Sequence, residues 1–158
     1  MKNIFIPFLL ILFLASCNIC QTNENITPLW SDGILTAECI NATYIAEVHF
    51  DESDVTLSFS EPDFLSNTVF KINEGSINLL KDDISLRYDN EEIKGFISEF
   101  YKAYTTINSL SPKYTSEGEV CIAEFISDNK KCKVIIEKNT KKVVSCETSD
   151  CIYSFTKR

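Results

Sequence analysis

Apolar and polar side chains alternate with a period of two residues along most of this chain. Before residue 90 the alternation marks five short segments: 44–50, 55–60, 70–72, 77–79 and 84–88. Side chains of a β-strand point alternately to opposite faces of the sheet, so each segment predicts a strand that buries one face. Polar turns such as 51–54 and 81–83 separate the segments. We expect neighbouring strands joined in this way to pair antiparallel.

The period changes once, between residues 89 and 111. An apolar stripe there repeats at every third or fourth residue: Ile93, Phe96, Ile97, Phe100, Tyr104 and Ile107. This spacing predicts one amphipathic α-helix of about 17 residues. Asp89 with Glu92 resembles a capping box at the helix start, and Pro112 prevents continuation beyond Ser111. We expect the helix to lie on the apolar face of the sheet.

Alternation returns after the helix and continues nearly to the end of the chain. It predicts four further strands: 119–125, 132–136, 143–144 and 152–155. The predicted fold class is therefore α+β, with a curved antiparallel sheet of about nine strands, five before the helix and four after it, wrapped over one long helix. Residues 34–158 are enough for a single domain of this kind.

The first 16 residues are typical of a secretory signal peptide. Lys2 supplies a positive charge, and residues 4–15 form an apolar run of twelve residues. A transmembrane helix needs about 20 apolar residues, so this run is too short to span a bilayer. Leu14-Ala15-Ser16-Cys17 resembles the lipobox of bacterial lipoproteins. This resemblance implies that Cys17 carries diacylglycerol, with palmitate-type acyl chains, and anchors the protein on the extracytoplasmic face of a bacterial cell membrane.

Residues 17–33 are predominantly polar and lack the period of a strand or a helix. This composition predicts a tether between the lipidated cysteine and the domain. Trp30, the only tryptophan, has two interpretations. It lies at the membrane surface or the mouth of a ligand site, or it packs against the first turn of the domain.

Two other origins of the chain stay open. An ordinary signal peptide cleaved after Ser16 or Asn18 would release a soluble protein. A eukaryotic secreted protein is a second alternative, because Asn25-Ile26-Thr27 and Asn41-Ala42-Thr43 both fit the glycosylation sequon.

The charge of the chain argues against binding of nucleic acid. Fifteen Lys and Arg stand against 23 Asp and Glu, and nucleic-acid binding requires clustered cations. Acidic residues dominate 38–99, whereas 128–158 is basic. The basic end either lies against an anionic membrane or forms solvated strand faces.

Two motifs are similar to those of small Gram-positive lipoproteins with a LolA/LolB-like half-barrel. The first is Ser60-Glu61-Pro62-Asp63-Phe64-Leu65, followed by the alternating strand 68–72, and the second is the turn Glu137-Lys138-Asn139-Thr140. The resemblance implies a concave sheet face that can hold an acyl chain or another apolar ligand. It carries over no catalytic residues. The cysteines of this chain are unusual for proteins of that kind.

Six cysteines remain when Cys17 is set aside. They are Cys20, Cys39, Cys121, Cys132, Cys146 and Cys151. Outside the cytoplasm an even number is compatible with up to three disulfides, whose connectivity the sequence leaves open. Buried free thiols are the alternative, because Cys121 and Cys132 fall in apolar stripes. We expect no metal site, since no Cys-x-x-Cys pair occurs and the chain has one histidine.

We expect no enzymatic activity and no cofactor. His49 shares the polar face of a strand with Glu47, and a solvated strand surface explains that pair as well as acid–base chemistry does. No nucleophile elbow or phosphate-binding loop is present. The acidic segments 51–54 and 82–83 are interpreted as turns.

Two functions from different classes therefore follow from the sequence. The first is a lipid-anchored, non-catalytic module that binds a lipid or another apolar ligand between sheet and helix. Its expected lining residues are Phe59, Phe70, Leu86, Phe96 and Phe100. The second is a structural or protein-interaction lipoprotein of the cell surface, with a filled core and no ligand.

Overall fold

The computed structural model describes residues 20–22, 26–52, 54–74, 76–89, 95–110 and 112–157. The predicted signal peptide (1–16), Cys17 and part of the predicted tether lie outside the described residues. The side chain of Cys20 also lies outside them.

Twelve strands and one α-helix make up the described domain. The strands are β1 (Cys20–Thr22), β2 (Gly33–Cys39), β3 (Ala42–Asp51), β4 (Asp54–Glu61), β5 (Thr68–Ile72), β6 (Ser76–Lys81), β7 (Ile84–Asp89), β8 (Tyr114–Glu117), β9 (Val120–Ser127), β10 (Lys130–Glu137), β11 (Val143–Glu147) and β12 (Cys151–Thr156). The α-helix is α2 (Phe96–Ser109), and a short 3₁₀ helix, η1 (Asp63–Leu65), precedes β5.

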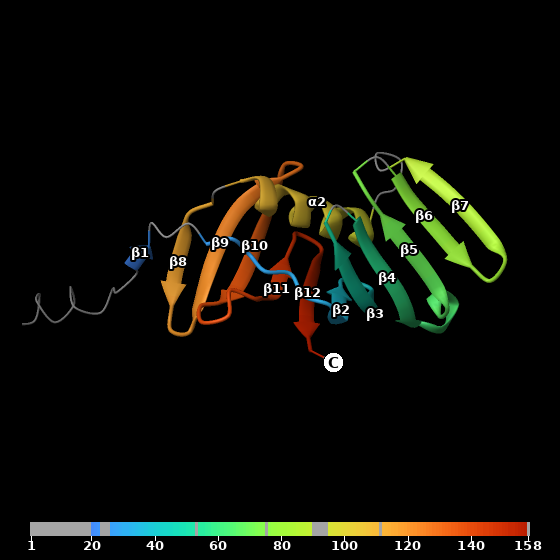
Figure 1. Cartoon of the computed structure of the whole chain (residues 1–158), viewed down its shortest axis with the longest axis horizontal. Helices are drawn as coiled ribbons and strands as arrows, with labels where there is room; N and C mark the ends of the chain where they lie inside the picture. The colour runs from blue at the N-terminus through green and yellow to red at the C-terminus, as the bar shows by residue number, and fades with distance from the viewer. Residues whose placement is uncertain are drawn as a thin grey trace, which may run out of the picture.

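All twelve strands belong to one antiparallel sheet. Its order is β1-β8-β9-β10-β11-β12-β2-β3-β4-β5-β6-β7, so β1 and β7 are the two edge strands. The sheet is curved, and α2 lies across its middle (Figure 1). Most neighbours in the sheet are also neighbours in sequence, as predicted from the short polar turns. The exception at the centre is β12, which pairs with β2 and joins the two halves of the chain.

The predicted α+β class is confirmed, but the prediction of nine strands is wrong. The alternation missed β1, β2 and β8. β1 has three residues and β8 has four, which is too short to show a period of two. In β2 the inward-facing positions include Ala37, whose small side chain gives a weak apolar signal although it is 1% exposed.

The helix begins later than predicted. Gly95 occupies the N-cap position with a φ of 129°, a conformation that glycine adopts without steric cost. The predicted capping box at Asp89 is therefore wrong. The predicted end is close, because the amide of Leu110 donates to Thr106 and the helix stops at Ser109.

One hydrophobic core lies between α2 and the concave face of the sheet. The predicted helix stripe is confirmed within the described residues, because Ile97, Phe100, Tyr104 and Ile107 are all buried. Strands on both sides of the β12–β2 junction contribute to this core: Leu35, Val55, Leu57, Ile72, Val134, Ile136 and Tyr153 are each at most 2% exposed. The helix thus holds the two halves of the sheet together.

Candidate functional site

The concave face continues onto β5, β6 and β7, and its apolar side chains change from buried on β5 to exposed on β7. The strand register places these residues in three rows across the three strands: Thr68, Lys81 and Ile84; Phe70, Leu79 and Leu86; Ile72, Ile77 and Tyr88. We call this set the open apolar face. Seven of its nine residues are apolar, and all nine lie on the same side of the sheet as the core.

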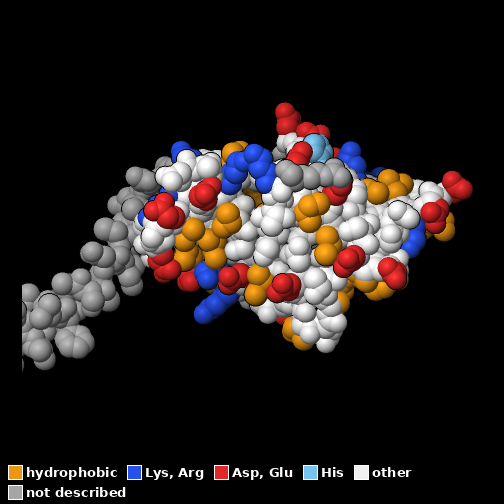
Figure 2. Space-filling view, turned by 90° about the horizontal axis from the view of Figure 1, so that it is seen from below, with side chains coloured by type: hydrophobic (Ala, Val, Ile, Leu, Met, Phe, Trp, Pro, Cys, Tyr) orange, Lys and Arg blue, Asp and Glu red, His pale blue; other side chains and the backbone are white. Residues whose placement is uncertain are grey.

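Exposure of the open apolar face rises toward the edge strand. Along its middle row Phe70 is 7% exposed, whereas Leu86 on β7 is 43% exposed. Ile84 and Tyr88, which flank Leu86 on the same face, are 59% and 36% exposed. Hydrophobic side chains are visible at the β6–β7 end of the molecule, on the right of Figure 2. A contiguous exposed apolar surface of this kind is typical of a binding site.

Two polar groups border this face at one end. Thr68 is 1% exposed, and its Oγ1 atom has no hydrogen-bond partner among the residues that the structure describes. Lys81 lies directly opposite Thr68 in the register, and its ammonium donates to the carbonyl of Phe64 at 2.6 Å. A buried hydroxyl without a partner is unfavourable, so Thr68 is the one residue of this face whose polar atom is not accommodated by the described residues.

The structure brings together three of the five predicted lining residues. The ring of Phe59 lies 5.5 Å from that of Phe70 and 5.9 Å from that of Phe96. Leu86 lies two strands further out, in the same row as Phe70. Phe100 is separate from these residues, in the aromatic cluster described next.

A second aromatic cluster fills the space between the middle of α2 and the sheet. Phe100 is fully buried, with its ring 6.1 Å from that of Trp30 and 5.2 Å from that of Tyr153. Phe50, Tyr104 and Phe155 complete the cluster. The structure thus supports the interpretation in which Trp30 packs against the domain. The indole also donates to Asn108 at the end of the helix.

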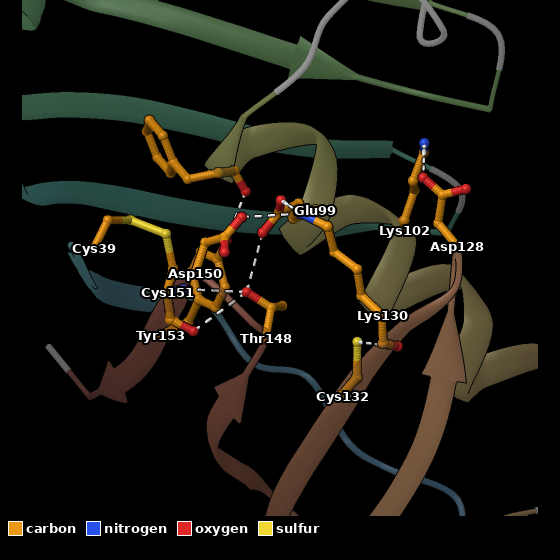
Figure 3. A network of polar contacts seen from close by, with 11 residues as sticks. Cys39, Glu99, Lys102, Asp128, Lys130, Cys132, Thr148, Asp150, Cys151 and Tyr153 are labelled. Carbon is orange, nitrogen blue, oxygen red and sulfur yellow. Dashed lines mark hydrogen bonds and ion pairs between the residues drawn. A yellow bond between two sulfur atoms is a disulfide. The ribbon is translucent and has the colours of Figure 1, made fainter. Parts of the chain in front are cut away.

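Ionic contacts attach the first turns of α2 to the sheet (Figure 3). The ammonium of Lys130 contacts the carboxylate of Glu99 and, at 2.9 Å, that of Asp150. Thr148 donates to Glu99 at 3.2 Å. The buried hydroxyl of Tyr153 donates to the carbonyl of Phe96 at 2.7 Å. Every polar group in this network has a structural partner, which indicates a role in stability.

The network predicts a specific dependence of stability on pH. The hydrogen bond from Lys130 lowers the pKa of Asp150 below its usual value. The contribution of ionised Asp150 to the free energy of unfolding is complete above the pKa of an aspartate in the unfolded state, about 3.9. It is lost as the pH falls through the lower pKa of the folded state. We expect wild-type stability to fall below about pH 4, and Asp150→Asn to reduce that fall. Urea unfolding of both proteins between pH 2 and pH 7 measures how the free energy of unfolding depends on pH.

Asp82→Asn is the matched control for this measurement. Asp82 is exposed in the β6–β7 turn at a φ of 50°, which asparagine tolerates. An Asp82→Asn protein with the same change in pH dependence as Asp150→Asn would contradict a specific effect of the Lys130 contact.

The cysteines form one disulfide among the described residues. Cys39 and Cys151 are bonded, and they lie directly opposite each other on β2 and β12. Cys121, Cys132 and Cys146 are buried free thiols, so both interpretations drawn from the sequence are realised in part. Burial strongly raises the pKa of Cys146, which keeps this thiol protonated and unreactive. In the described part of the chain, no group of three His, Cys, Asp or Glu side chains is arranged to hold a metal ion.

His49 pairs with Asp32 on the surface. Its Nδ1 lies 2.5 Å from the Asp32 carboxylate, which also accepts the backbone N–H of Phe50. A shallow pocket of about 260 Å³ adjoins the pair and is lined by Glu47, Thr56 and Ser58 among others. The side chain of His49 is 64% exposed. This exposure fits the solvated strand surface predicted from the sequence.

A larger surface pocket, of about 500 Å³, lies where β10 and β11 separate. It is lined by Glu124, Phe125, Ile126, Lys131, Cys132, Lys133, Glu147, Thr148 and Ser149. Charges of both signs line it, and Lys133 contacts Glu147 at 3.5 Å. The basic charge of residues 128–158 is therefore partly neutralised here, and the lining combines charged residues with the apolar Phe125, Ile126 and Cys132.

Sequence reasoning missed most of the open apolar face. It selected Leu86 and Phe70 but not Ile84, Leu79 or Tyr88, although these residues show the same alternation. Which residues share a row depends on how β5, β6 and β7 align. The short turn between β6 and β7 fixes Lys81 opposite Ile84, and this turn was the sequence signal from which the alignment of β6 with β7 could have been predicted. The residue types of Thr68 and Lys81 did not indicate that these residues belong to the open apolar face.

No protein-family model matches the chain, and a search of curated proteins finds no similar sequence. Among the described residues, no helix has the length and hydrophobicity that a membrane span requires.

Proposed function

We propose that this chain is a membrane-anchored lipoprotein whose domain is a non-catalytic binding module for a lipid or another apolar ligand. In this proposal Cys17 carries the lipid, and the domain lies on the extracytoplasmic face of a bacterial cell membrane. The fold is then an open half-barrel similar to that of LolA/LolB-like proteins. The observation that carries the proposal is the open apolar face, where apolar side chains of the core surface continue into solvent on β7.

The same face also defines where a ligand would bind. The space beneath the middle of α2 is occupied by the rings around Phe100, so the ligand site is assigned to β5–β7. Carboxylates of Glu61, Asp63, Asp82 and Asp83 lie in the segments that surround Lys81. This negative surrounding disfavours anionic ligands relative to uncharged ones.

The first experiment measures binding of an uncharged apolar probe to the purified protein. N-phenyl-1-naphthylamine becomes fluorescent in apolar sites, and we expect it to bind the wild type. Leu86→Arg places a charge in the middle of the open apolar face, so we expect the Kd to rise at least about tenfold, equivalent to about 1.4 kcal/mol. Leu86 is exposed, so the variant is expected to fold.

Ile126→Arg is the matched control, because Ile126 is 66% exposed on β9 and lines the surface pocket of about 500 Å³, away from the open apolar face. It should leave the Kd unchanged. Equal loss of binding in both variants, or no binding to wild type and no co-purifying lipid in native mass spectrometry, would contradict the proposed ligand site. That second result would favour the alternative of a surface interaction protein without a ligand, which the filled helix–sheet interface also supports.

The membrane anchor is tested separately by the mass of the mature N-terminus. A chain that begins at Cys17 with added diacylglycerol is expected. Cys17→Ser should abolish both the added mass and recovery in the membrane fraction. An unmodified N-terminus at any position would contradict the anchor and leave the ligand site unaffected.

A further inference from the structure

β7 is an edge of the sheet, and no strand of the described residues pairs with its outer side. All five residues from Ile84 to Tyr88 are exposed, so side chains on both faces of the strand meet solvent. Edge strands are usually blunted by short length, proline, charged side chains or a bulge. β7 has six residues, pairs with β6 in an unbroken register and contains no proline, and its charged residues are Arg87 and the terminal Asp89. The opposite edge, β1, is blunted by its length of three residues.

The sequence of β7 is complementary to itself. A two-fold axis perpendicular to the sheet that passes through Leu86 would place Leu86 opposite its own copy. Ile84 would then lie opposite Tyr88 of the second copy, and Ser85 opposite Arg87. All three apolar residues of β7 would therefore pair with apolar residues on the concave face, and cross-strand pairs of this kind stabilise a sheet.

The neighbouring symmetric registers are less favourable. An axis through Arg87 would set two arginines directly opposite each other, and like charges in that position are destabilising. An axis through Ser85 would set Arg87 directly opposite Asp83, but it would also set Tyr88 opposite Asp82, so that one of the three apolar residues would meet an acidic residue in each half of the interface. The register through Leu86 avoids both conflicts. In this register Arg87 lies diagonally across from both Asp83 and Arg87 of the second copy, so the preference for it comes from the apolar pairs and not from charge.

We propose that two copies of this chain pair antiparallel through β7, with Leu86 on the two-fold axis. The occupant of this edge is thus a second copy of the chain, which the self-complementary apolar pairs Leu86–Leu86 and Ile84–Tyr88 specify. The pairing extends one sheet into the other and makes the two open apolar faces continuous. It uses the backbone edge of β7, so it goes beyond the proposed ligand binding and does not rest on it.

A single pair of six-residue strands is a small interface beside the roughly 1,200–2,000 Å² that stable complexes bury. We therefore expect a weak dimer, and the test captures it covalently. Leu86→Cys is introduced into the full chain, and the purified protein is treated with a mild oxidant and run on a non-reducing gel. Opposed Cα atoms in an antiparallel pair lie about 4.5–5.5 Å apart, within the reach of a disulfide. A cross-linked dimer is the expected product, formed at least about tenfold faster than in the wild type.

Ile84→Cys and Tyr88→Cys are matched controls on the same face of the same strand. In the proposed register each lies four residues, about 13 Å, from its own copy, so neither variant should cross-link alone. A mixture of the two should cross-link, because Ile84 lies opposite Tyr88 of the second copy. Random collision predicts the reverse, because Ile84 is more exposed than Leu86.

Two results would overturn the proposal. One is cross-linking of Leu86→Cys no faster than wild type, whose other cysteines supply the background. The other is cross-linking of Ile84→Cys alone at the rate of Leu86→Cys. Circular dichroism of each variant verifies that the sheet is intact, and the probe-binding measurement of the preceding section reports independently on the ligand site.

Discussion

Replacing Phe100 by alanine is expected to lower the free energy of unfolding by about 3–5 kcal/mol. Phe100 is fully buried and lies at the centre of the cluster that joins α2 to both halves of the sheet. Its ring contacts Trp30 from the segment before β2 and Tyr153 from β12. Truncation would leave a cavity that these rings cannot fill without breaking other contacts, so the cost includes both lost transfer energy and the cavity.

Urea unfolding followed by circular dichroism measures this loss, and the fluorescence of Trp30 reports on the cluster itself. Phe64→Ala is the control, because Phe64 is 68% exposed in η1. Its effect is expected to stay within about 0.5 kcal/mol. A Phe100→Ala protein as stable as the Phe64→Ala protein would contradict the assignment of Phe100 as the centre of the core.

The sequence was sufficient to predict the elements whose side chains have a clear period. The strand from Tyr44 to Phe50 and the helix stripe through Phe100 were both recognised, because burial of one face forces the period on the sequence. The same signal fails where an element is short or uses small residues, as in β8 and β2. It also failed at the helix start, because Gly95 supplies a local conformation that the stripe does not encode.

The candidate site was less predictable because it depends on the order of strands. The concave face, where Phe59, Phe70 and Phe96 meet, followed from alternation and the helix stripe alone. The exposure of that face changes from strand to strand, from 7% at Phe70 on β5 to 43% at Leu86 on β7, and alternation alone does not encode this change. The exposed position of Leu86 therefore required the tertiary structure. The partnership of Cys39 with Cys151 likewise required knowledge that β12 pairs with β2.

Loss of the Cys39–Cys151 disulfide is expected to lower the free energy of unfolding by about 2–5 kcal/mol. The two cysteines are 112 residues apart in sequence, so the bond closes a long loop and removes much of the conformational freedom of the unfolded chain. They also lie on β2 and β12, at the junction of the two halves of the sheet. Urea unfolding of Cys39→Ala/Cys151→Ala, compared with the wild type, measures the loss.

Reduction provides the matched control for this prediction. Wild type in dithiothreitol should unfold at the urea concentration of the double variant, and dithiothreitol should not destabilise the double variant further. The second expectation follows because Cys121, Cys132 and Cys146 are free thiols. Among the described residues, the double variant therefore has no disulfide for dithiothreitol to reduce. A double variant that loses further stability in dithiothreitol would reveal a second disulfide. A double variant as stable as the wild type would contradict the stabilising role of the bond.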